Sequence, residues 1–441
     1  MGMHARNADH GRTRRSMEGT EDEGEHGSEA TDVDTGGRPK AMEVLIVGAG
    51  VIGCAIAREL ALDHEVRVLD RNGVAGGATG RSAGLIAPTL FFGNLPETAR
   101  YANAFFERFD GTGEFSFTRR ERLDLVGAGV DTDSAGSEGD EGSAGGEGAA
   151  GNEADEERKA RKRAARLYEQ GFPVRYLDGA AIEARYPAFD ADSFAGAVWY
   201  GDTGWVDPYT YTVELRRAAE RRGARFETSV EVRAITEREG GVEIETSEGR
   251  RRADRVGLAA GWRTPDLVGR DGTPDPIPVS PYRTQCVVLD PVDSLPRDFP
   301  LVRASGEKLY FRPEHDGTLL VGGGYGLVDP TAASEAADER FRNHVAEAIP
   351  RLIDGFDDAG FVPGWAGVDS GTPDGRPVID TISERVVVAT GFSGLGVMAS
   401  PIAASAVRAL VTGESETVPL EPFRHDRFEG TETGVRFTSD A

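Results

Sequence analysis

A short apolar strand that runs into glycines opens the patterned part of the chain. Residues 43–47 read Glu-Val-Leu-Ile-Val and lead directly into Gly48-Ala49-Gly50-Val51-Ile52-Gly53. Apolar residues then recur at helical spacing over 51–62, and residues 65–69 alternate as a second strand that ends at Asp70. The pattern predicts a strand–helix–strand unit of about 30 residues, the length that a dinucleotide-binding fingerprint requires.

Further along, strands and helices surround a β-rich middle. Helices are predicted over about 209–222 and 338–348, and a strand, a glycine turn and a helix are predicted over 386–410. Strands are also predicted over 225–232, 242–246, 285–289 and 318–322, and a buried strand with a glycine turn over 255–262. This order predicts an α/β protein with a Rossmann-like domain and a second, α+β domain that contains a mixed β-sheet.

Three stretches lack such a pattern. Residues 1–41 carry mixed charge without an apolar run, and residues 127–158 consist mostly of glycine, alanine, serine and carboxylates. We predict a disordered N-terminal tail and a disordered acidic insertion, because neither stretch can bury enough apolar surface to fold. A solvated basic helix is expected over 158–166, pairing with the acidic run, and a C-terminal tail over 426–441. Met42 directly precedes the first strand, so either a misplaced start or a dispensable N-terminal tail is expected.

The charge balance narrows the class of protein. Asp and Glu number 75 against 50 Lys and Arg, a formal net charge of −25, which argues against a nucleic-acid partner. Four lysines among the basic residues, with this acidic excess, suggest a salt-rich cytoplasm and hence a halophile. Two cysteines and seven scattered histidines show no metal-ligand spacing, so no metal is predicted. The longest uncharged run, 386–407, is broken by glycines and Pro401; we predict no membrane span and a cytoplasmic protein.

The glycine motif between the first strand and helix has a physical rationale. Gly48 allows the tight turn, Gly50 lets a pyrophosphate approach the backbone, and Gly53 permits close packing of helix on strand. The helix N-terminus then faces the anion. Asp70, twenty residues after Gly50, is placed to accept hydrogen bonds from a ribose diol and disfavours a 2′-phosphate. The motif predicts that the protein binds a dinucleotide, and both NAD and FAD are compatible with it.

Several further blocks occur in a defined order along the chain. They are Ala78–Leu85, Val206-Asp207-Pro208, Ala259-Ala260-Gly261-Trp262, Tyr310-Phe311-Arg312-Pro313, Trp365-Ala366-Gly367 with Gly371–Gly375, and Ala389–Met398. With these blocks the chain resembles the D-amino-acid oxidase-like flavoprotein family, especially its glycine oxidase and sarcosine oxidase branch. The resemblance covers about residues 43–410, apart from the acidic insertion.

The resemblance implies FAD as the cofactor and a division into two domains. The FAD-binding domain would comprise residues 42–96, 203–265 and 365–425, and the substrate domain residues 97–202 and 266–364. No histidine or cysteine stands near Arg81, Ser82 or Gly367, where relatives with covalent flavin carry one, so non-covalent FAD is expected. The residues implied to contact FAD are Gly48, Gly50, Val51, Ile52, Gly53, Asp70, Arg71, Ala78, Thr79, Ala83, Gly84, Leu85, Val230, Gly261, Phe392, Ser393, Gly394, Leu395, Gly396, Val397 and Met398.

The implied reaction is hydride transfer to flavin N5 from the carbon next to the nitrogen of a small amino acid or N-methyl amino acid, with hydrolysis of the resulting imine. Tyr310 stands where the glycine oxidase branch has a tyrosine that reaches the substrate carboxylate. Asp369 replaces the arginine that pairs with this carboxylate, and aspartate cannot make that contact. Either Arg283, Arg312 or Arg376 supplies the cation, or Asp369 meets an amine, or Asp369 only caps a turn.

The electron acceptor and the substrate class stay open. Strand 318–322 lacks the lysine that sarcosine-oxidase-like relatives place there, which leaves either oxygen or an electron carrier as acceptor. The alternatives are a dye-linked dehydrogenase of proline or of a hydroxy acid, the flavin subunit of a hetero-oligomeric electron-transfer complex, and an NAD-binding protein without flavin.

Overall fold

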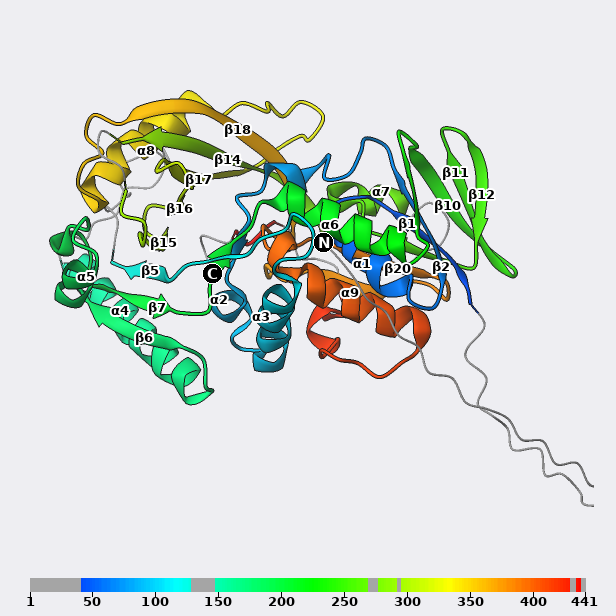
Figure 1. Ribbon diagram of the computed structural model, residues 1–441, viewed down its shortest axis with the longest axis horizontal. Coiled ribbons are helices and arrows are strands. Elements are labelled where there is room, and N and C mark those ends of the chain that lie inside the picture. The colour runs from blue at the N-terminus through cyan, green and yellow to red at the C-terminus, as the bar shows by residue number, and fades with distance from the viewer. Residues whose placement is uncertain (1–40, 128–146, 269–276, 292–294, 429–433, 438–441) are drawn as a thin grey trace, which may run out of the picture. The chain divides into compact units, whose positions relative to one another are not determined.

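The computed structural model describes residues 41–127, 147–268, 277–291, 295–428 and 434–437, and every structural statement below concerns these residues (Figure 1). The predicted N-terminal tail therefore lies outside the described residues, apart from Ala41.

A six-stranded sheet forms where the sequence predicts the Rossmann-like part (Figure 1). Neighbouring strands are parallel except β19 and β20, which are antiparallel. A parallel sheet has both faces covered, which explains why the predicted strands here are apolar runs. In spatial order the strands are β19 (Val378–Thr381), β20 (Val386–Thr390), β13 (Arg255–Leu258), β1 (Glu43–Val47), β2 (Glu65–Asp70) and β9 (Arg225–Thr228).

Alternate residues of β1 face two different layers. Val44 and Ile46 share a core with several helices, among them α1, α6 and α9, whereas Leu45 and Val47 share a core with a small antiparallel sheet. Of the helices, α1 packs against both α6 and α9. The helices are α1 (Val51–Leu60), α6 (Pro208–Arg221) and α9 (Gly396–Thr412), and the small sheet contains β10 (Val232–Arg238), β11 (Gly241–Thr246) and β12 (Gly249–Ala253).

The second large sheet of the protein is mixed and has eight strands. Only β15 and β5 are parallel neighbours, and the other neighbours are antiparallel. Together the two large sheets confirm the predicted α/β class with a mixed sheet. In spatial order the strands are β18 (Gly360–Gly371), β14 (Ser280–Asp290), β17 (Leu319–Leu327), β16 (Leu309–Pro313), β15 (Leu301–Ala304), β5 (Arg122–Val126), β7 (Gly196–Tyr200) and β6 (Val174–Asp178).

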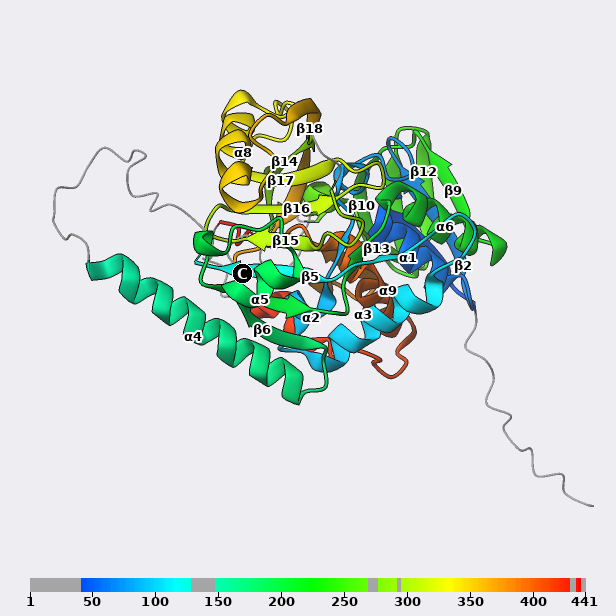
Figure 2. The same ribbon diagram turned by 60° about the vertical axis from the view of Figure 1, so that its left-hand side comes forward.

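Shorter elements connect and cover these sheets. Helix α8 packs on the eight-stranded sheet, where its buried face joins the core of β14 to β17 (Figure 2). Further elements include β3 (Leu85–Ile86), β8 (Gly204–Trp205), β4 (Thr118–Arg119), α2 (Pro88–Phe92), α3 (Pro96–Phe109), α4 (Glu147–Glu169), α5 (Gly179–Arg185), α7 (Thr264–Leu267), α8 (Glu339–Leu352) and the 3₁₀ turn Ala78–Arg81.

The acidic insertion is partly helical, which corrects the prediction of disorder over 127–158. Residues 128–146 lie outside the described residues, but 147–158 form the first half of α4, which lies along the outside of β6 and β7 (Figure 2). Ala160, Ala164 and Leu167 are buried at helical spacing, so the predicted solvated helix has one packed face. Asp155 pairs with Lys159 at 2.7 Å within this helix, which gives local support to its exposed side.

One further predicted strand differs from the structure. The single strand predicted over 225–232 is divided into β9 and β10, because Ser229 adopts a left-handed conformation with φ 62° between them. The predicted domain boundary at 364/365 falls inside β18, which runs unbroken from 360 to 371. The division into FAD-binding and substrate domains therefore stays a prediction.

Candidate functional site

The glycine turn after β1 is held by contacts that leave no room for side chains. Gly48 has φ 109°, and a Cβ there would lie 2.3 Å from the carbonyl oxygen of Ala259. A Cβ on Gly53 would lie 1.9 Å from the carbonyl oxygen of Gly48. Both glycines are therefore required by close backbone approach, as the fingerprint predicts.

Asp70 at the end of β2 is tied to the same turn. Its Oδ2 accepts a hydrogen bond of 2.7 Å from the N–H of Ala49, and its Oδ1 accepts one from Asn72. The N-terminus of α1 has no side-chain cap, although Thr79 Oγ1 accepts a hydrogen bond from the N–H of Val51 at 3.1 Å. The turn thus presents the positive end of a helix and a nearby carboxylate to one cavity.

This nucleotide-side cavity has a volume of about 360 Å³. It extends from the glycine turn and the end of β2 to the start of α9. The predicted FAD contacts in its wall are Gly48, Gly50, Val51, Ile52, Asp70, Arg71, Ala78, Thr79, Val230, Gly261, Phe392, Gly394, Gly396 and Val397.

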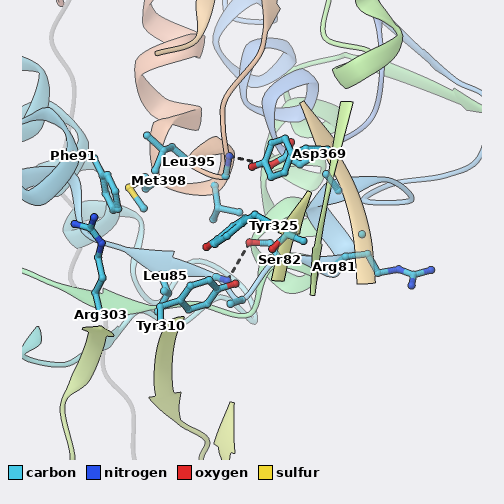
Figure 3. Close-up of a pocket in the computed structure, with 18 of the residues that line it drawn as sticks. Arg81, Ser82, Leu85, Phe91, Arg303, Tyr310, Tyr325, Asp369, Leu395 and Met398 are labelled. Carbon is cyan, nitrogen blue, oxygen red and sulfur yellow. Dashed lines mark hydrogen bonds between the residues drawn. The ribbon is translucent and has the colours of Figure 1, made fainter. Parts of the chain in front are cut away.

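A second, smaller cavity of about 90 Å³ adjoins the first (Figure 3). The two share wall residues, among them Ser82, Asp369 and Gly394. Among the predicted residues, Ala83, Gly84, Leu85, Leu395, Met398, Tyr310 and Asp369 line it. The structure thus brings the two groups of predicted residues to one continuous site.

Three predicted residues line neither cavity. Gly53 lies beneath the glycine turn, where it packs on Gly48. Ser393 is buried and left-handed with φ 51°, and its Oγ accepts a hydrogen bond from Thr372 N at 3.2 Å. Arg312 is buried between strands, where Nε donates to the carbonyl of Ala83 at 2.9 Å. These residues shape the walls without reaching the cavity.

Asp369 lies near the end of β18, where both cavities meet. Its Oδ1 accepts a hydrogen bond from Ser370 N at 2.7 Å, and its Oδ2 accepts one from Gly394 N at 3.0 Å and one from the Tyr282 hydroxyl at 3.3 Å (Figure 3). Burial raises the pKa of the carboxyl group, although these three hydrogen bonds oppose the shift. Asp369 therefore fixes the loop before α9 and also borders the cavity.

Tyr310 points its ring into the wall of the smaller cavity (Figure 3). Its hydroxyl lies 3.7 Å from the Sγ of Cys286, and burial raises the pKa of the phenol well above its usual range. A Cβ on Gly322 would lie 2.1 Å from the ring, so the neighbouring strand needs glycine there. The tyrosine is packed in the core and exposed to the cavity at the same time.

None of the three arginines proposed to replace the missing cation lines the smaller cavity. Arg283 is bound to Asp338 at 2.9 Å and to the carbonyl of Ser334 at 3.1 Å. Arg312 pairs with Glu314 at 3.0 Å, and Arg376 is absent from the wall of either cavity.

The cations in the wall of the smaller cavity are others: Arg122, Arg303, Lys308 and Arg81. Sequence reasoning missed Arg122 and Arg303. The signal available was the strand 122–126, where charged residues alternate with apolar ones although the strand is buried throughout.

The described part of the C-terminal tail packs beside this cavity. The ring of Phe437 stacks on Tyr325 with centroids 5.3 Å apart and meets Tyr282 edge-on at 5.2 Å. Arg436 N donates a hydrogen bond to the carbonyl of Thr372 at 3.0 Å. The sequence predicted only a C-terminal tail over 426–441 and not this contact. The two tyrosines lie more than a hundred residues away in sequence, so the local pattern gives no sign of the contact.

In the described ranges, no three or more His, Cys, Asp or Glu side chains gather as a metal ion would need. Within the same ranges, none of the helices has the length and apolar character needed to cross a membrane.

Comparison with known proteins identifies relatives over most of the chain. The family model described as FAD dependent oxidoreductase matches residues 43–410. Glycine oxidase from Geobacillus kaustophilus is 26% identical over 401 residues, which cover 88% of this chain and 97% of that protein. The bifunctional protein ThiO/ThiG from Synechocystis is 28% identical over 263 residues, 57% of this chain and 37% of that protein. The chain spans between 37% and 55% of the length of the first relatives it matches.

Solved structures show the same fold. The crystal structure of glycine oxidase from Geobacillus kaustophilus matches with a TM-score of 0.74 at 23% identity, covering 88% of this chain and all of that one. L-proline dehydrogenase from P. horikoshii matches with a TM-score of 0.75 at 22% identity, covering 90% of this chain and all of that one.

Proposed function

We propose, since this chain belongs to the FAD-dependent oxidoreductase family, that it oxidises the C–N bond of a small amino acid or N-methyl amino acid. The observation that carries the proposal is the pair of adjoining cavities, one shaped for a dinucleotide and one small, with Asp369 in the wall of both. The glycine oxidase of Geobacillus kaustophilus, to which the chain is similar, supports it.

The residues present fit FAD. The turn around Gly48 gives a pyrophosphate access to backbone N–H groups at the start of α1, and Asp70 is available to a ribose diol. Gly394 and Gly396 open the far end of the same cavity without side chains. When bound, FAD supplies the two-electron acceptor for the reaction. Non-covalent attachment is part of the proposal.

The chain itself supplies groups for the substrate nitrogen. Asp369 is the carboxylate at the junction of the cavities, and its raised pKa makes it a better proton acceptor than an exposed aspartate. Its Oδ1 accepts only one backbone hydrogen bond and keeps a lone pair. We propose that Asp369 orients the substrate nitrogen and accepts its proton, while Tyr310 closes one wall of the cavity.

Part of the wall of the smaller cavity is apolar, which would limit the access of water to the reacting atoms. Leu85, Leu395 and Met398 lie around it, together with the ring of Phe91 (Figure 3). Dry surroundings strengthen every charge contact inside the cavity. The small volume of the cavity, about 90 Å³, also favours a substrate of a few heavy atoms.

The identity of the electron acceptor is also open, and the position of Lys308 is relevant to it. No lysine lies in β17, as the sequence showed, but Lys308 adopts a left-handed conformation with φ 54° and lines the smaller cavity. Either oxygen or a carrier is proposed as acceptor. Comparing oxygen consumption with dye reduction in wild type and Lys308→Met separates the two.

The test of the proposed reaction is identification of its products. The protein, loaded with FAD, is incubated with glycine, sarcosine or D-alanine and a redox dye, and released ammonia or methylamine is measured beside dye reduction. The proposal expects one amine per two electrons for at least one substrate. Dye reduction by a hydroxy acid with no release of amine from any amino acid would contradict it.

A further inference from the structure

We propose that residues 329–336, between β17 and α8, form a strap that closes over the nucleotide-side cavity and opens to admit and release FAD. The ion pair of Arg81 with Glu335 holds the strap closed, and Arg283 anchors it. The inference concerns the cofactor alone. It goes beyond the proposed function, and it stands or falls whether or not the protein oxidises an amino acid.

The strap forms one side of the nucleotide-side cavity. It follows β17, a strand of the eight-stranded sheet, whereas the glycine turn across the cavity follows β1 of the six-stranded sheet. The cavity is therefore bounded by parts of two different sheets, and its width depends on where the strap lies. The strap residues in its wall are Pro330, Ala333, Ser334 and Glu335.

An ion pair joins the strap to the opposite wall. Arg81 Nη2 lies 2.9 Å from Glu335 Oε2, and both residues line the nucleotide-side cavity. Their side chains are 34% and 78% exposed, so the pair lies at the solvent end of the cavity. In Figure 3 the Arg81 side chain points away from Tyr310 and Tyr325. The pair thus closes part of the mouth of the cavity without entering the smaller cavity.

Arg283 of β14 holds the backbone of the strap from below. Its Nε donates a hydrogen bond to the carbonyl oxygen of Ser334 at 3.1 Å, and its Nη2 donates one to the carbonyl oxygen of Ala336. Its Nη1 pairs with Asp338, the N-cap of α8, at 2.9 Å. The Arg283 side chain is only 12% exposed. The arginine that the resemblance offered as a substrate cation is therefore occupied by the strap.

The strap has little burial of its own. None of residues 329–336 is buried, and Asp329 Oδ1 accepts hydrogen bonds from the N–H and the hydroxyl of Thr331 within the strap itself. A backbone hydrogen bond of 2.7 Å, from Ala366 N to the carbonyl oxygen of Glu335, joins it to β18. A segment held by a few polar contacts opens at a lower free-energy cost than the domain unfolds.

The first experiment measures FAD exchange in Glu335→Gln. Uptake of FAD by the apoprotein is followed by flavin fluorescence, and release is followed after mixing the loaded protein with an excess of a FAD-binding trap protein. We expect both rates to rise about two- to fivefold, the effect of one exposed ion pair, with nearly unchanged affinity. The control is Glu347→Gln, an exposed carboxylate of α8 that lines neither cavity and should exchange FAD as wild type does.

Three results of this experiment would overturn the inference. Unchanged rates would show that the pair does not hold the strap. Slower release would show that Glu335 acts only by repelling the pyrophosphate. Faster release with unchanged uptake would show that Glu335 is a static contact of FAD, because a segment that opens changes both rates.

A double-mutant comparison tests the pair itself. Because the proposed partner of Glu335 is Arg81, Glu335→Gln should cause no further change in either rate in an Arg81→Met background. An equal acceleration in both backgrounds would contradict the pair. The wild-type and Glu335→Gln rates should also converge in about 1 M salt, which screens exposed charges.

The largest change is expected at the anchor. Arg283→Met loses the hydrogen bonds to two carbonyl groups, so both rates should rise about ten- to a hundredfold, and Arg283→Lys should change them less. The control is Arg342→Met, an exposed arginine of α8. Wild-type rates in a folded Arg283→Met apoprotein, checked by its melting temperature, would contradict the anchor. If this variant does not fold, the Glu335→Gln and Arg81→Met comparison decides alone.

Discussion

The two cavities differ in how the chain builds them. The nucleotide-side cavity is formed largely by backbone and small residues, such as Gly48, Gly50 and Gly394, that lie in short continuous motifs. The smaller cavity is formed by long side chains from separate strands, such as Arg122, Tyr310 and Tyr325. A site made from backbone tolerates few changes of sequence, whereas a site made from side chains can change its ligand by substitution of one residue. In the proposed function, the first cavity holds the cofactor and the second holds the substrate.

The largest expected effect comes from adding one methyl group beneath the nucleotide-side cavity. Gly53→Ala forces a Cβ against the carbonyl of Gly48, so we expect a loss of about 3 kcal/mol of stability or more and loss of FAD. Gly326→Ala in β17 is the control, since a Cβ there meets nothing within 4 Å and Gly326 lines neither cavity. Melting temperature and bound FAD per chain are the measurements, and normal FAD content in Gly53→Ala would contradict the role of the turn.

Asp369→Asn should affect the smaller cavity and leave FAD binding intact. Amine release is expected to fall by about a hundredfold or more, since the proposed proton acceptor is lost. Steady-state rates, measured beside FAD content, check this prediction. A variant as active as wild type would show that Asp369 only holds the loop before α9.

The same variant has a predictable pH dependence of stability. Because the folded-state pKa of Asp369 is raised, the folded protein binds this proton more tightly than the unfolded chain, and stability is lost as pH rises above the unfolded value of about 4. Asp369→Asn removes this loss, so its melting temperature relative to wild type should rise with pH. Asp374 provides the opposite control: burial opposes its ionisation, but Arg427 together with the hydrogen bonds from Arg376 N and the Thr372 hydroxyl outweighs burial and lowers the pKa. Asp374→Asn should therefore destabilise the protein at neutral pH and less so in acid.

Removing the Tyr310 hydroxyl should have a smaller effect. Tyr310→Phe keeps the ring that packs on Gly322 and loses only the contact with Cys286 and any hydrogen bond to ligand. We expect a two- to tenfold rise in KM, about the value of one hydrogen bond, with unchanged FAD content. A loss of FAD would show that the ring, not the hydroxyl, had been disturbed.

The smallest effect is expected at the C-terminal segment 434–437. Phe437→Ala removes ring contacts with Tyr325 and Tyr282, worth about 1 kcal/mol. Because Tyr325 and Tyr282 line the smaller cavity, the KM for the amino-acid substrate should change by a few-fold. Steady-state kinetics of the variant measure this, and an unchanged KM would mean that the segment packs on the cavity wall without shaping it.

The fold was predictable where local rules apply. The glycine turn, Asp70 and the order of strands and helices follow from spacing, and α6 begins at Pro208 as its sequence suggests. The smaller cavity was only partly predictable: Tyr310 and Asp369 were found through the resemblance, but Arg122 was not. Its neighbour Arg303 is 181 residues away in sequence, and only the parallel pairing of β5 and β15 brings them together. The helical start of α4 was missed because its apolar face begins at Ala160, after the acidic run.

The measurement that tests the account most directly is anaerobic titration of the FAD-loaded protein with glycine, sarcosine, D-alanine, D-proline and L-proline, followed by admission of air. The account predicts that at least one of these zwitterions bleaches the flavin absorbance, while the corresponding amines without a carboxylate, such as dimethylamine for sarcosine, do not. Bleaching by the simple amines as readily as by the amino acids, or by none of these compounds, would contradict it.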